Sequence, residues 1–167
     1  IGDARYEIRQ LDKQYDLIIL DVFTGGSEPI HLLTVETLTQ LKSLLTDGGI
    51  LALNFVAFLD EGDNPALASV GKTLAEVFPY QTVFISEPGI DFNDFIFLAA
   101  DHDIDLATSS LSRNQKQWLN NRRIEVNSDQ GLILTDNYNP LEQLQIRKSE
   151  HYRQVMMEFM GNGHFVR

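Results

Sequence analysis

Cysteine is absent from the 167-residue chain and basic residues are scarce, with 13 Lys and Arg against 24 Asp and Glu, a formal net charge of −11. Without cysteine there is no disulfide, thiolate nucleophile or thiolate metal ligand, which favours a reducing, cytoplasmic environment. The negative charge argues against nucleic acid and anionic membranes as partners. The sequence also has no apolar run of membrane-spanning length and no signal-peptide pattern.

Several familiar site patterns are missing as well. There is no P-loop, no G-x-G-x-x-G turn and no G-x-S-x-G elbow, and the four histidines lack ligand-type spacing. Asp101, Asp103 and Asp105 alternate like the start of a calcium loop. However, Leu106 replaces the required glycine and Ser112 the bidentate glutamate. We therefore expect no metal site.

The hydrophobic pattern predicts an α/β fold. Strand-like apolar runs occupy residues 17–20, 50–55, 81–85 and 95–100. Helical patterns occupy residues 4–11, 34–45, 66–77, 109–123 and 141–160. The continuous run at 17–20 is typical of a strand covered on both faces, and Asp47-Gly48-Gly49 is expected to end the second helix. The order of elements indicates parallel strands followed by an antiparallel edge hairpin.

The strand at 17–20 leads directly into Asp21 and a glycine-containing loop. Ligands bind outside the carboxyl ends of strands in open α/β sheets, so Asp21 is a candidate site residue. Its apolar neighbours would partly desolvate the carboxylate and raise its pKa toward the range of a general base. A carboxylate that caps the loop at the strand end fits the spacing equally well.

Two other polar segments attract attention. The first, Gly2-Asp3-Ala4-Arg5, is a candidate nucleobase clamp, because a carboxylate can accept from the adenine amine while backbone N–H groups donate to the ring. Asp3 can equally be a helix N-cap, and these residues alone favour the cap. Residues 136–142 can edge a pocket, although a turn into the last helix is the favoured interpretation.

Together these motifs resemble the spermidine synthase-like (polyamine aminopropyltransferase) family. The resemblance rests on residues 2–4, 15–21, 31–34, 45–54, 78–79 and 134–142. It implies the second half of a Rossmann-like, S-adenosylmethionine-dependent methyltransferase-type three-layer sandwich. Residues 1–167 are then a single domain without the N-terminal glycine-rich βαβ unit, and residues 101–167 form a helical C-terminal extension.

The resemblance also implies an activity in polyamine biosynthesis. Family members transfer an aminopropyl group from decarboxylated S-adenosylmethionine to a diamine, without a metal. Asp21 is then the catalytic residue that accepts a proton from the attacking amine, which a nearby carboxylate is suited to do. The nucleoside is expected to contact Asp3, Ala4, Asp21, Val22 and Phe23.

The substrate-binding positions depart from the family pattern. Thr24 stands where the family carries a second Asp, and Phe92 stands near the position of a family Tyr. These departures keep two alternatives open: an S-adenosylmethionine-dependent methyltransferase and a non-catalytic scaffold. A small-molecule nucleoside and a polyamine are the expected ligands. Because the strand at 17–20 lacks its family neighbour, we also expect a homodimer that forms through its apolar edge or across the exposed helix face.

Overall fold

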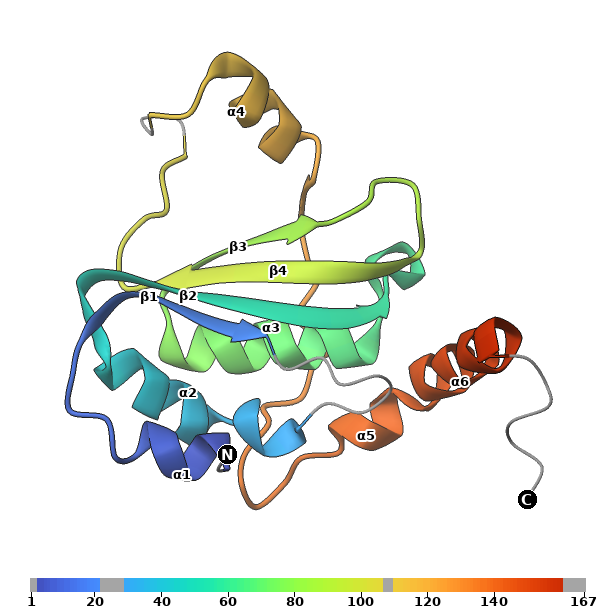
Figure 1. Cartoon of the computed structure of the whole chain (residues 1–167), viewed down its shortest axis with the longest axis horizontal. Coiled ribbons are helices and arrows are strands. Elements are labelled where there is room, and N and C mark those ends of the chain that lie inside the picture. Colours follow the sequence, from blue (N-terminus) through green and yellow to red (C-terminus); the bar gives the residue numbers. More distant parts are fainter. Residues whose placement is uncertain (1–2, 22–28, 107–109, 161–167) are drawn as a thin grey trace.

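The computed structural model describes residues 3–21, 29–106 and 110–160 and is built around a five-stranded sheet (Figure 1). The strands are β1 (Tyr15–Asp21), β2 (Leu45–Phe58), β3 (Tyr80–Ile85), β4 (Phe92–Ala100) and β5 (Arg123–Ile124), and their order is β1-β2-β4-β3-β5. β1 and β2 are parallel, whereas the other pairs are antiparallel. The predicted parallel part and antiparallel hairpin of β3 and β4 are therefore confirmed.

Two helices, α2 (Val35–Ser43) and α3 (Pro65–Val77), cover one face of this sheet. The other helical elements are α1 (Ala4–Ile8), η1 (Ile30–Leu32), η2 (Asp60–Gly62), α4 (Arg113–Asn120), α5 (Leu141–Leu144) and α6 (Ile146–Met160). α2 and α3 lie below the sheet in Figure 1, whereas α4 lies on its opposite side. Thr34 caps α2 by accepting from the Thr37 N–H, and Asn64 caps α3. These side chains satisfy N–H groups that the first helical turn leaves without partners.

The core lies between the sheet and the helices α2 and α3 beneath it. Alternate residues of β2 and β4 point toward α2 and α3 and are almost fully buried. They pack with apolar residues spaced three and four apart on the helices. The members with 2% exposure or less include Leu51, Leu53, Phe55, Phe95, Phe97, Leu38, Leu41, Leu67 and Leu74. This packing fixes the direction of β1 and β2 and hence the place where their carboxyl ends lie.

The burial predicted for β1 is wrong on one face. Leu17 and Ile19 are 52% and 67% exposed, although Leu20 is buried. α2 and α3 cover only one face of the sheet, and β1 pairs with β2 alone among the described strands. The opposite face of β1 therefore keeps apolar side chains in contact with solvent.

The predicted end of the second helix is also wrong. α2 ends at Ser43, and residues 47–49 lie inside β2 instead of terminating the helix. The pairing register between β1 and β2 shifts between Tyr15 and Leu17. An added Cβ at Gly49 would lie 2.9 Å from the Tyr15 carbonyl oxygen, so the glycine permits this close backbone approach.

The final helical segment divides at Gln145. Its backbone leaves the helical conformation between α5 and α6, and its side-chain Nε2 donates to the Val56 carbonyl at 3.1 Å. None of the helices in the described ranges is long and apolar enough to span a bilayer.

Candidate functional site

Asp21 ends β1 and is paired in register with Asn54 of β2. The Asn54 amide Nδ2 donates to the Asp21 carboxylate at 3.2 Å, which fixes the orientation of that carboxylate. The Asn54 carbonyl Oδ1 is buried and accepts no hydrogen bond from the residues that the structure describes. Asp21 itself is exposed, so the predicted partial desolvation of its carboxylate is wrong. The exposed Asp21 carboxylate therefore lies at the end of the parallel strands, where it suits an N–H donor or a cation.

Asp3 is the N-cap of α1, as its position before the helix predicted. One carboxylate oxygen accepts from the Tyr6 N–H at 3.0 Å, and the other lies 3.6 Å from His31 Nε2. Both side chains remain substantially exposed. Ala4 follows in the first turn of the helix, where backbone N–H groups have no acceptor within the helix. The cap interpretation is confirmed, and the second oxygen of Asp3 still faces solvent and His31.

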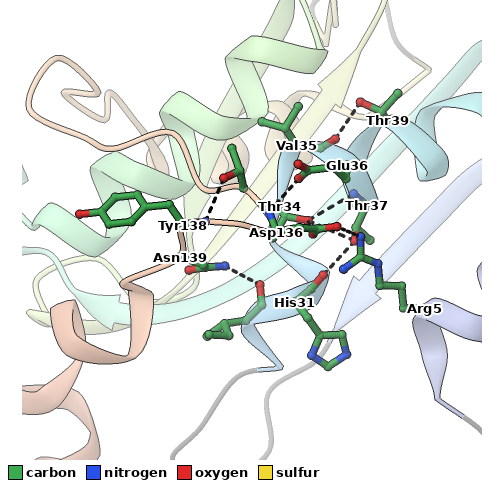
Figure 2. Close-up of polar contacts among 12 residues, drawn as sticks. Arg5, His31, Thr34, Val35, Glu36, Thr37, Thr39, Asp136, Tyr138 and Asn139 are labelled. Carbon is green, nitrogen blue, oxygen red and sulfur yellow. Dashed lines mark hydrogen bonds and ion pairs between the residues drawn. The ribbon is translucent and has the colours of Figure 1, made fainter.

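Arg5, in the same helix as Ala4, belongs to a polar cluster around Asp136 (Figure 2). Asp136 accepts hydrogen bonds from the Arg5 guanidinium and, at 2.9 Å, from the Thr34 hydroxyl. Its backbone N–H donates to Glu36 at 3.0 Å. The hydrogen bond from Arg5 lowers the pKa of Asp136 below its usual range against the opposing effect of burial, and the same bond raises the pKa of Arg5. Both groups are therefore charged at neutral pH.

The cluster belongs to a turn at residues 134–139, which we call the Asp136 turn. Thr135 and Tyr138 close it with two backbone hydrogen bonds. The Asn139 side chain donates to the Ile30 carbonyl at 2.8 Å, and the Val35 N–H donates to the Leu134 carbonyl at 2.9 Å. The favoured interpretation of this segment as a turn into the last helices is confirmed, and the turn holds the segment that contains His31.

Phe92 begins β4 and lies apart from Asp21. It pairs with Phe58, which is four residues beyond Asn54 on β2, about 13 Å along the strand. Its ring packs 5.0 Å from the Phe58 ring and 4.6 Å from the His151 ring of α6. A substrate role for Phe92 stays a prediction.

Three of the predicted site residues, Val22, Phe23 and Thr24, lie outside the described residues. The structure gives Asp3 and Asp21 each a partner from a distant segment. No hydrogen bond or ion pair joins these two pairs within the described part of the chain. Asn54 was not predicted as a site residue, although a polar side chain inside the apolar run 50–55 was a usable signal.

Two curated proteins are similar in sequence to part of the chain. No family model matches it. An N-terminal histidine N-methyltransferase from Emericella nidulans is 38% identical over 88 residues, which is 50% of this chain and 15% of that protein. A polyamine aminopropyltransferase from Vibrio vulnificus is 43% identical over 56 residues, which is 32% of this chain and 19% of that protein.

The fold comparison agrees with the resemblance in sequence. The chain is similar to the crystal structure of a probable spermidine synthase from Corynebacterium glutamicum, with a TM-score of 0.55 and 25% identity over 66% of this chain and 40% of that one. The chain is similar to spermidine synthases in fold and, over part of its length, in sequence. Its sheet corresponds to a Rossmann-like fold of the type shared with methyltransferases. The chain spans 40% of the length of the Corynebacterium glutamicum structure and less than 20% of each of the two curated relatives.

Across the described ranges, no group of three or more His, Asp or Glu side chains is placed to hold a metal ion.

Proposed function

We propose that the chain supplies the carboxyl-terminal half of the substrate site of a spermidine synthase-like transferase, with Asp21 as its base. The observation that carries this proposal is the Asp21–Asn54 pair at the end of the parallel strands. Ligands of open α/β sheets bind at this end. An exposed carboxylate held by an amide is well placed to meet a cationic amine.

In the proposed reaction the amine substrate binds as a cation and loses a proton to Asp21. Its nitrogen lone pair attacks the carbon beside the sulfonium of decarboxylated S-adenosylmethionine. The new N–C bond forms while the C–S bond breaks, and the electron pair of that bond remains on sulfur in methylthioadenosine. Asp21 contributes by holding the cation close and by taking the proton, which are effects of orientation and general-base catalysis.

The nucleoside of the donor is assigned to Asp3 and Ala4, with Val22 and Phe23 from the loop after β1. The Asp3 oxygen that faces His31 and solvent fits an adenine amine. Backbone N–H groups at the start of α1, other than those of Tyr6 and Glu7, fit ring nitrogens. Thr24 and Phe92 are assigned to the amine substrate through the resemblance alone.

A methyltransferase is the second candidate. The relative with the longer match carries the name of an N-terminal histidine N-methyltransferase. Thr24 also replaces the second acidic residue that a diamine is expected to use. In this alternative the donor is S-adenosylmethionine and Asp21 faces the amine that receives the methyl group. A third possibility is a non-catalytic scaffold with the same fold.

Calorimetric titration separates these proposals. The chain is titrated with methylthioadenosine, decarboxylated S-adenosylmethionine and S-adenosylmethionine, alongside Asp3→Ala and Asp21→Ala. Asp101→Ala is the control, since Asp101 follows β4 at the opposite end of the sheet. Preference for the decarboxylated donor supports the aminopropyltransferase, and preference for S-adenosylmethionine supports the methyltransferase. No binding at millimolar ligand contradicts an independent nucleoside site and leaves either an incomplete enzyme or a scaffold.

We also infer that two copies of the chain associate through β1, in the cytoplasm. The exposed Leu17 and Ile19 side chains and the outer edge of β1 support this inference. Apolar strand edges tend to pair with another strand when nothing covers them. Residues 1–167 are then one domain in each copy, with residues 101–167 contributing β5 and the last helices.

A further inference from the structure

The helix that carries Asp3 and Ala4 is too short to be stable by itself. α1 has five residues, and none of them is buried. Isolated helices shorter than about 12 residues are marginal in water even with favourable sequences. The position of α1 must therefore come from its tertiary contacts, of which the described residues offer Ile8 against the core and the Arg5 side chain.

Arg5 connects α1 to the Asp136 turn. Only 16% of its side chain is exposed, and its guanidinium forms an ion pair with the Asp136 carboxylate. Its Nε is buried and has no acceptor among the described residues. Asp136 is thus the principal polar anchor of Arg5. A charge-assisted hydrogen bond of this kind is stronger than a neutral one and fixes geometry.

The Asp136 turn is itself fixed by hydrogen bonds to α3 and to the N-cap of α2. Leu134 is fully buried, and its N–H donates to the Thr73 hydroxyl of α3 at 2.9 Å. This hydrogen bond fixes the position of the Leu134 backbone. The Asp136 carboxylate is held on its other oxygen by the buried Thr34 hydroxyl. Because the turn is bonded to α3 and to the cap residue of α2, the Asp136 carboxylate has a fixed position, and so does the Arg5 side chain that it binds.

The same turn also positions His31. Asn139 donates to the Ile30 carbonyl, and Thr37 donates to the His31 carbonyl at 2.8 Å, as Figure 2 shows. His31 Nε2 lies 3.6 Å from Oδ2 of Asp3. The turn therefore contacts both segments whose side chains meet at the nucleoside end of the proposed site.

We propose that Asp136 is a positioning residue of this site, which holds Arg5 and thereby places Asp3 and Ala4 beside His31. The inference rests on the proposed function, because it assigns a role in nucleoside binding to a residue outside the ligand contacts. It accounts for a contact between segments that are 131 positions apart in the sequence.

The test uses Asp136→Asn, which keeps the shape of the side chain and removes its charge. Hydrogen exchange is measured at the Tyr6 and Glu7 amides, whose native acceptors are both on Asp3. We expect at least tenfold faster exchange at these amides, unchanged exchange in β4, and about tenfold weaker binding of methylthioadenosine. Asp101→Asn is the matched control, because it removes the ion-pair partner of Lys42 by the same substitution.

A double-mutant cycle with Arg5→Gln separates positioning from general stability. If Asp136 acts through Arg5, then Arg5→Gln weakens binding as much as Asp136→Asn does, and the double variant loses no more than either. Additive losses overturn the proposal, as does unchanged methylthioadenosine affinity or unchanged exchange at Tyr6 and Glu7. If the unaltered chain binds no nucleoside, the proposed function fails first, and the site that Asp136 serves fails with it.

Discussion

Arg5 and Asp136 form an ion pair although they are 131 positions apart in the chain. The pair joins the first helix to a turn near the end of the chain and is supported by the Thr34 hydroxyl. Residues 134–139 thus belong to the same structural unit as the motifs at the start of the sequence. The proposed substrate site depends on both ends of the chain.

The ion pair predicts a dependence of stability on acid pH. The pKa of Asp136 is lowered in the folded chain, chiefly by the hydrogen bond from Arg5. A lowered carboxyl pKa contributes stability that is present above the unfolded value of about 4 and is lost as the pH falls through the folded value. In urea unfolding, we expect Asp136→Asn to be less stable than the unaltered chain by about 1–2 kcal/mol at pH 7. The difference should shrink below pH about 4.

The corresponding variant at Asp101 provides the comparison. Asp101→Asn removes an ion pair whose carboxylate is 54% exposed, and exposed pairs contribute about 0–1 kcal/mol. A difference between Asp136→Asn and the unaltered chain that stays constant from pH 7 to pH 2 contradicts the assignment of the lowered pKa to this pair.

Asn54→Val separates the role of Asn54 in ligand binding from its role in the fold. The substitution removes the hydrogen bond to Asp21 and also the buried carbonyl that lacks a donor among the described residues. Losing a buried unpartnered group offsets the lost hydrogen bond, so the free energy of unfolding should change by less than about 1 kcal/mol. The affinity for decarboxylated S-adenosylmethionine, measured by calorimetry, should fall severalfold. A large loss of stability with unchanged affinity would assign Asn54 to the fold alone.

Gly131→Ala tests the packing of the segment that precedes the Asp136 turn. A Cβ at this position would lie 2.4 Å from the Ala68 carbonyl oxygen of α3, a contact that requires the backbone to move. We expect a destabilisation of about 1–3 kcal/mol, measured by chemical unfolding. Gly48→Ala is the control, because nothing lies within 4 Å of a Cβ there. Equal stabilities of the two variants would contradict the close approach.

The exposed face of β1 predicts a change in association. Ile19→Lys places a charge on the strand edge that we infer to be shared by two copies. Sedimentation velocity should show dimers of the unaltered chain and monomers of the variant, with the same circular dichroism spectrum. Ile146→Lys, at an exposed position of α6, should leave the dimer intact. A monomeric unaltered chain at tens of micromolar rules out the inferred pairing.

The local elements were largely predictable because their signals are local. The apolar runs at 17–20 and 95–100 became β1 and β4, and Thr34 caps α2 where the helical pattern begins. The boundary at residues 47–49 was not predictable. Glycine after a helical pattern usually ends the helix, whereas here Gly49 allows the β2 backbone to approach Tyr15. That approach depends on a partner strand which lies 34 residues away.

For the proposed site, the sequence by itself determined where the two candidate carboxylates stand: Asp3 before a helix and Asp21 at the end of a strand. Composition and periodicity also determined the α/β class, because burial patterns repeat with the period of each element. Tertiary structure alone decided their partners. Asn54 reaches Asp21 through strand pairing, and Asp136 reaches Arg5 through packing of the last turn on α2 and α3. Such contacts depend on the whole core, and no local pattern along the chain encodes them.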